Sequence, residues 1–227
     1  MKTIELHGVV GEDFTAASIS RALPASGPVR VLLNSGGGYA AEGAAIHAIL
    51  AAHPGDVAID VIGIAASAAS LIAMAGKRIT MRAGAVMMIH DPLNITIGNS
   101  ADHAKTIEEL EVYARAYARV YAARARISEA RAREIMVAET WYDGPQAVAA
   151  RFADAVDSAA AAPFASYGYD NYRHAARAMA AAQRVAAQTP AAAWARVIAK
   201  ANGTYRAPPN AWSHLVEARN KQVRRHL

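Results

Sequence analysis

The sequence contains no cysteine, which excludes disulfide bonds and thiolate metal sites. It also has few aromatic residues, 7% of 227, and no run of about 18 uninterrupted apolar residues, so hydropathy predicts no membrane-spanning helix. The N-terminal MKTIELHGVV lacks the long apolar core of a secretory signal. From these absences we expect a soluble, cytoplasmic protein that has no membrane partner.

The composition that is present is that of a globular protein, with 54% hydrophobic and 19% charged residues. The net charge of +5 is unevenly distributed, because residues 170–227 hold ten Lys and Arg but only two acidic residues. Residues 1–169 are therefore mildly acidic. A basic tail of this kind can bind an acidic partner or nucleic acid, although a solvated helix face is the commoner explanation.

Strand-like and helix-like patterns alternate along the first hundred residues. Short branched apolar runs predict strands at 4–10, 29–33 and 57–63 and within RITM and AVMMIH. Apolar spacing predicts helices at 14–23, after the glycines of NSGGG (34–38), and in the Ala-rich GIAASAASLIAMAG (63–76). This alternation favours an α/β core with crossover connections.

The second half of the chain is predicted to be mainly helical. Asn99 or Ser100 can cap a helix of about seven turns, which is long enough to project beyond one core or pack against another subunit. A second helix begins near Ser128, and Gly144-Pro145 precedes a short helix over 146–152. We expect a domain at 1–160, a linker at 161–172 and a basic, Ala-rich helical extension at 173–227.

Two segments could carry chemistry. The glycines of NSGGG let backbone N–H groups approach an oxyanion, although a plain turn is the commoner use of such a run, and no Walker or dinucleotide motif is present. Ser67 lies where a strand gives way to a helix whose first N–H groups are unpaired. It is either a nucleophile or a helix cap, and Ser70, one turn on, is a rival.

A nucleophilic serine needs a base and an orienting acid. Among eight histidines, His90 ends an apolar strand-like run, where side chains emerge at a site. Glu139, Asp143 and Asp91 are the candidate acids, and spacing alone does not choose between them.

Four ordered segments resemble the proteolytic subunit of the Clp protease, and more closely the ClpP-like head maturation proteases of tailed phages and prophages. NSGGG resembles the family's NSPGG element, GIAASAAS its G-x-A-A-S nucleophile segment, MMIHDP its M-I-H-x-P, and ETWYDGPQAVAARFADAV its closing segment. GNSAD (98–102) and the ETW at 139–141 match the phage-type relatives. The resemblance covers roughly residues 2–157.

The resemblance implies an α/β fold of the crotonase-like ββα superhelix type, with a long protruding helix that interleaves between two face-to-face rings, here followed by a helical C-terminal appendage. It implies a serine endopeptidase that hydrolyses peptide bonds inside an oligomeric ring without a cofactor or metal. The implied partners are copies of the chain and a polypeptide substrate. If a phage encodes the chain, they include capsid or scaffold proteins in the host cytoplasm.

Carried over residue by residue, the resemblance implies that Ser67 is the nucleophile, His90 the general base and then acid, and Glu139 the orienting carboxylate. The implied oxyanion hole consists of the N–H groups of Gly38 and Ala68, with Gly37 adjoining. Two positions depart from the pattern of the cellular subunit: Glu139 stands in place of Asp, which leaves Asp143 open, and Gly36 replaces the proline of NSPGG.

Two other functions compete with proteolysis. The long helix and the basic tail would also suit a ring-forming assembly protein whose catalytic residues are vestigial. A crotonase-type acyl-CoA enzyme uses glycine-containing oxyanion loops as well, but it does not require an ordered Ser, His and acid. Labelling by a fluorophosphonate probe separates these functions, because only an activated serine reacts.

Overall fold

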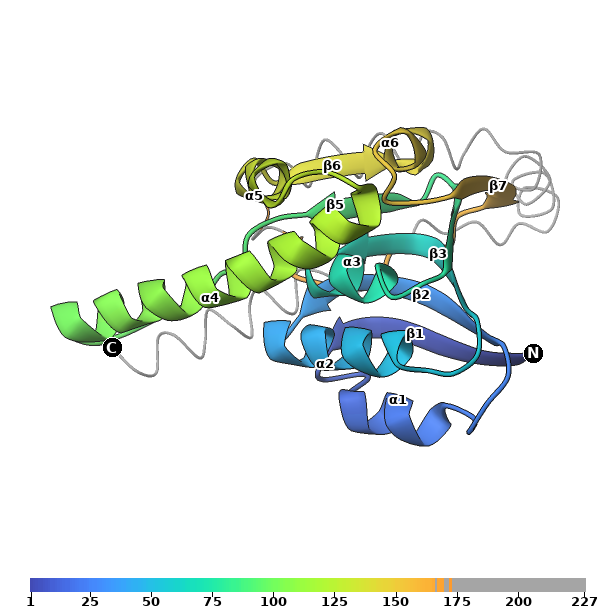
Figure 1. Ribbon diagram of the computed structural model, residues 1–227, viewed down its shortest axis with the longest axis horizontal. Coiled ribbons are helices and arrows are strands. Elements are labelled where there is room, and N and C mark those ends of the chain that lie inside the picture. Colours follow the sequence, from blue (N-terminus) through green and yellow to red (C-terminus); the bar gives the residue numbers. More distant parts are fainter. Residues whose placement is uncertain (166, 170–171, 173–227) are drawn as a thin grey trace, which may run out of the picture.

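The computed structural model describes residues 1–165, 167–169 and 172, and it shows a mixed α/β protein built on a seven-stranded sheet. Five parallel strands lie in the order β1-β2-β3-β4-β7 (Figure 1). Their bounds are β1 Lys2–Val10, β2 Val29–Gly38, β3 Val57–Ala66, β4 Arg78–Ala83 and β7 Ala155–Ala160. A shorter branch consists of β5 (Val86–Ile89), parallel to β3, and β6 (Thr140–Asp143), antiparallel to β5.

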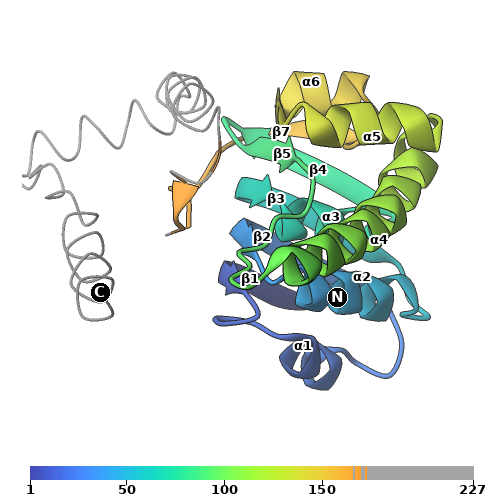
Figure 2. The same cartoon turned by 90° about the vertical axis from the view of Figure 1, so that its left-hand side faces the viewer.

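Six helices connect these strands: α1 Ala16–Ala22, α2 Ala40–Ala51, α3 Ala68–Ala73, α4 Ser100–Ala125, α5 Glu129–Val137 and α6 Gly144–Ala149. Figure 2 shows α2, α3 and α4 on the same side of the sheet. None of the helices within the described ranges is long and apolar enough to cross a membrane. The predicted C-terminal extension at 173–227 lies outside the described residues.

The predicted alternation of strands and helices is confirmed, but two strands are longer than the sequence indicated. The strand expected to end at Leu33 continues through NSGGG to Gly38, so the glycines form the end of β2 and are not a turn. The strand expected to end at Gly63 continues to Ala66, and the Ala-rich helix after it has only six residues. Both extensions pair with neighbouring strands, and these tertiary partners override the weak strand propensity of glycine and alanine.

The closing segment also differs from the prediction. β6 was not predicted, because four residues next to a charged helix give little pattern. The short helix starts at Gly144 and not after Pro145, since Asp143 accepts a hydrogen bond from the Gln146 N–H and proline is tolerated in the first turn.

The long helix α4 is confirmed, with 26 residues and Asn99 as its cap. Asn99 accepts hydrogen bonds from two N–H groups while Asp102 accepts from the Asn99 N–H, a reciprocal capping box. Only the second half is buried, at Ala114, Tyr117 and Tyr121, and Ile107 in the first half is 63% exposed. The first half therefore projects from the domain, as Figure 1 shows.

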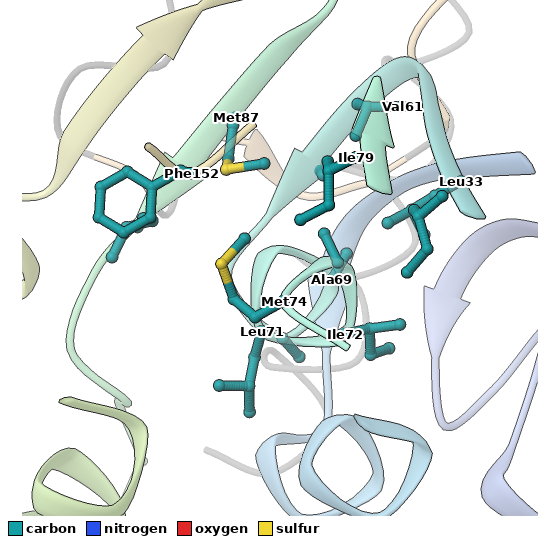
Figure 3. Packing of buried hydrophobic residues seen from close by; sticks show 14 of the residues in the cluster. Leu33, Val61, Ala69, Leu71, Ile72, Met74, Ile79, Met87 and Phe152 are labelled. Atoms are coloured by element: carbon teal, nitrogen blue, oxygen red, sulfur yellow. The ribbon is translucent and has the colours of Figure 1, made fainter. Parts of the chain in front are cut away.

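Apolar side chains of the sheet belong to two hydrophobic clusters, one on each face of the sheet. In β5, Met87 and Ile89 belong to the main core, whereas Val86 and Met88 face the other way. The main core packs β-strand residues against α3 and the loop after α6, as with Leu71, Met74 and Phe152 in Figure 3. The second cluster also contains Tyr169 and Tyr172, which follow β7 in the sequence.

Candidate active site

Ser67 occupies a strained turn between β3 and α3. Its backbone has φ 56° and ψ −126°, a conformation that favours glycine, and its N–H donates to the carbonyl of Met88. Although Ser67 stands at the capping position of α3, its side chain makes no capping hydrogen bond. The capping explanation therefore does not account for this serine, and the strain instead holds its side chain at the strand end.

His90 is the residue that meets Ser67. It follows β5 directly, and its Nε2 lies 2.8 Å from the Ser67 Oγ, a hydrogen-bond distance. Both side chains are half-buried and border a cavity of about 310 Å³. The parallel pairing of β3 with β5 thus brings His90 into contact with Ser67, which lies 23 positions before it in the sequence.

Ser70, the rival serine, lies in a different environment. It is fully buried, its hydroxyl donates to the Ser67 carbonyl, and it is 2.8 Å from the hydroxyl of Tyr121. Burial raises the pKa of Tyr121, so this phenol stays protonated and pairs with Ser70. Ser70 therefore links α3 to α4 and does not border the cavity.

Replacing Ser70 by alanine should lower the free energy of unfolding by about 1–3 kcal/mol, because the buried Tyr121 hydroxyl loses its partner. The alanine should not reduce reaction of the protein with a fluorophosphonate probe. Denaturant melts and intact-mass labelling measure the two effects. Loss of labelling in a folded Ser70→Ala protein would contradict this assignment.

Glu139 directly precedes β6, the strand that pairs with β5, and His90 directly follows β5. The last pair of this antiparallel ladder is Ile89 with Thr140, so His90 and Glu139 each stand one residue beyond its end. The Glu139 side chain is buried, its backbone has φ 49°, and its Oε1 accepts a hydrogen bond of 3.2 Å from the indole N–H of Trp141. A buried carboxylate at this position can orient an imidazole.

The other two candidate acids have different partners. Asp143 stands at the far end of β6, is exposed, and caps α6 by accepting the Gln146 N–H at 2.8 Å. Asp91 forms an ion pair with Arg133, which also contacts Glu111. Of these three candidate acids, only Glu139 is buried.

The glycines at the end of β2 allow backbone atoms to pack closely around Ser67. Gly37 has φ 114°, and a Cβ there would lie 2.7 Å from the Ser67 Cβ. Its N–H donates to the Ser35 Oγ at 3.1 Å. Gly38 and Ala68 border the cavity together with Ser67, and the Ala68 N–H begins α3, where the helix supplies no carbonyl partner. Both residues that were predicted to donate, Gly38 and Ala68, thus border the cavity, and the adjoining Gly37 is not among the residues that line it.

Three aromatic residues near the site were not singled out from the sequence: Trp141, Tyr167 and Tyr172. Trp141 contacts Glu139, and both tyrosines border the cavity. The available signal was the density of tyrosine in 167–172, which is unusual for a linker. The predicted boundaries at 160 and 172 stay predictions, but Ala165, Tyr169 and Tyr172 are buried.

A serine and a histidine in hydrogen-bond contact at a strained strand-to-helix turn, facing a cavity, form the arrangement of a serine hydrolase. The Clp protease family model matches residues 16–159. The chain belongs to the Clp protease family, a family of serine peptidases.

The solved structures agree on the fold. A point mutant of ClpP1 from Listeria monocytogenes is similar to this chain with a TM-score of 0.62 and 18% sequence identity, over 69% of this chain and 91% of that chain. The predicted ClpP-like α/β fold is thereby confirmed. No curated protein sequence matches the chain.

Proposed function

We propose that this chain is a serine endopeptidase in which Ser67 is the nucleophile, His90 the general base and acid, and Glu139 the orienting carboxylate. The observation that carries the proposal is the 2.8 Å contact between the Ser67 Oγ and the His90 Nε2 at the cavity wall. The third role is supported by the β5–β6 ladder, because its last pair, Ile89 and Thr140, stands next to His90 and Glu139 in the sequence.

In the proposed reaction, the Ser67 oxygen attacks the carbonyl carbon of a peptide bond while the His90 Nε2 accepts the hydroxyl proton. The carbonyl electron pair moves to its oxygen, and the N–H groups of Gly38 and Ala68 stabilise the resulting negative charge. His90 then gives its proton to the departing amine nitrogen. Water, activated by His90, hydrolyses the acyl-serine and restores the enzyme.

The cavity indicates the class of side chain that the enzyme would accept next to the scissile bond. Among the described residues that border it, none is Asp, Glu, Lys or Arg, and tyrosines from α4, Tyr113 and Tyr117, form one side. The Tyr117 hydroxyl donates to the Ala40 carbonyl at 2.6 Å, which fixes α4 over the start of α2. An uncharged side chain therefore fits best.

The proposal includes an oligomeric ring, in which the projecting half of α4 contacts other copies of the chain. Support comes from the exposed apolar residues Ile107 and Val112, which are 63% and 57% exposed on this helix. A role in phage head maturation, with capsid or scaffold proteins as substrates, is supported by the GNSAD and ETW segments alone.

The test is reaction of the full-length protein with a fluorophosphonate probe, followed by mass spectrometry of the labelled peptide. We expect one adduct, on Ser67, because a serine is nucleophilic only when a base accepts its proton. A folded protein that forms no adduct would favour the vestigial assembly function, and an adduct on another serine would remove Ser67 from its role.

A further inference from the structure

The chain beyond the matched family region returns to the candidate site. After β7, the Ala161 N–H donates to the Ala83 carbonyl at 2.8 Å, and the Ala162 N–H donates to the Ile62 carbonyl at 2.5 Å. These backbone bonds direct the chain across the carboxyl-terminal part of β3.

Asn34, the first residue of NSGGG, holds the next part of this segment. Its side chain is fully buried, its Nδ2 donates to the Pro163 carbonyl at 2.8 Å, and its Oδ1 accepts the N–H of Ala165 at 3.2 Å. The same Oδ1 accepts the N–H of Ile64 in β3 at 3.1 Å. A buried amide that is satisfied by this segment fixes the segment to the sheet.

The tyrosines that follow complete the second apolar cluster. Tyr169 and Tyr172 are 6% and 5% exposed and pack with Met88 and its neighbours, while Trp141 and Tyr167 pack at the edge. The side of β5 on which Val86 and Met88 lie is therefore packed against residues outside the family match, which ends at 159.

Tyr172 contacts both halves of the candidate site. Its ring lies edge-on to the His90 ring, with centroids 5.1 Å apart and planes at 77°. Its hydroxyl donates to the Gly36 carbonyl at 2.6 Å and lies 3.1 Å from where a Cβ on Gly37 would be, beside Ser67. Burial raises the pKa of Tyr172, so the phenol remains a donor.

Tyr167 explains the glycine that departs from the family pattern. Its ring stacks on Tyr172, with centroids 5.6 Å apart and planes at 18°. A Cβ on Gly36 would lie 2.4 Å from the Tyr167 Cγ, so no side chain fits there while Tyr167 is in place. The proline that the family carries at this position would collide with the ring.

We propose that Tyr172 is a positioning residue for His90 and the glycine segment, and that Tyr167 and Tyr172 form a wall of the substrate pocket. This inference rests on the proposed function, because it concerns the same site. The Tyr172 ring, edge-on to His90, restricts rotation of the imidazole. The Tyr172 hydroxyl holds β2 at Gly36, two residues before the proposed donor Gly38. In this proposal Tyr167 and Tyr172 support catalysis, and they do not inhibit the enzyme by blocking the site.

The test compares Tyr172→Ala, Tyr172→Phe and Tyr167→Ala by steady-state hydrolysis of uncharged fluorogenic peptides. We expect Tyr172→Ala to lower kcat by about 10²-fold, since a displacement of about 1 Å in a catalytic group costs that much. Tyr172→Phe keeps the ring against His90 and should recover most of kcat. Tyr167→Ala should act mainly on KM, because it removes pocket wall.

Two further variants sharpen the comparison. Gly36→Ala should reproduce the KM effect of Tyr167→Ala, because the new Cβ displaces the Tyr167 ring. Tyr169→Phe is the matched control, since it deletes a phenol hydroxyl in the same cluster whose partner is the Ala165 carbonyl and not the site. Its kcat should equal that of the wild type.

Hydrogen exchange at residues 34–38 provides a readout that needs no turnover. Tyr172→Phe should speed exchange there and Tyr169→Phe should not, because the Tyr172 hydroxyl bonds to Gly36 whereas the Tyr169 hydroxyl bonds to Ala165. A higher kcat/KM in Tyr172→Ala would show that Tyr172 blocks the site, and it would overturn the proposal. Unchanged kinetics together with unchanged exchange would overturn it as well. The two proposals can fail separately. If the wild-type protein forms no fluorophosphonate adduct, but Tyr172→Phe still speeds exchange at residues 34–38 relative to the wild type, the result counts against the proposed function and not against the positioning role of Tyr172.

Discussion

Ser67→Ala is expected to reduce the hydrolysis of a peptide substrate by about 10⁶-fold, to the background set by binding and the oxyanion donors. The loss is large because alanine removes the oxygen that lies 2.8 Å from the His90 Nε2 and that would attack the carbonyl carbon. Initial rates with a fluorogenic peptide and probe labelling measure it.

The matched control is Ser67→Gly, which removes the same hydroxyl. Because φ at this position is 56°, glycine relieves backbone strain that alanine keeps, so Ser67→Gly should be more stable than Ser67→Ala by about 1 kcal/mol. Equal loss of activity in two proteins of different stability would separate chemistry from folding. Retained hydrolysis in a folded Ser67→Ala protein would end the proposed mechanism.

Glu139→Gln is expected to lower kcat by about 10⁴-fold, because an amide can no longer stabilise the imidazolium or hold its tautomer. The substitution keeps the size of the side chain, and so the packing around Trp141. The kcat of purified protein with the same peptide measures the effect.

Asp143→Asn is the matched comparison for the second acid. Asparagine caps a helix about as well as aspartate, so both the stability of α6 and the kcat of the variant should stay near the wild type. If Asp143→Asn instead lost activity while Glu139→Gln kept it, the triad would have to be reassigned and the register argument would fail.

The alternation of apolar runs was sufficient to predict the α/β core and the long helix. Strands with branched residues and a 26-residue helix with a strong cap carry their own local signal. The glycine end of β2 and the whole of β6 carried none, because their strand conformation comes from pairing with partners that lie far away in the sequence.

For the candidate site as well, the sequence indicated some residues and left others open. The sequence indicated Ser67 and His90 by their places at strand ends and by the resemblance to the Clp family, but it left Ser70 and Asp143 open. The structure distinguishes them by partners: Ser70 bonds to Tyr121, and Asp143 caps α6. Partners of this kind depend on which elements lie side by side, and sequence spacing does not reveal that.

The sequence by itself determined the residue types of the site, the absence of thiol chemistry, and the alternation of strands and helices over the first hundred residues, because these follow from composition and local periodicity. Only the tertiary structure decided that position 67 meets position 90, that Glu139 is buried while Asp143 is exposed, and that Tyr167 and Tyr172 border the pocket. The physical reason is that strand register and the docking of a distant segment are set by long-range hydrogen bonds and packing.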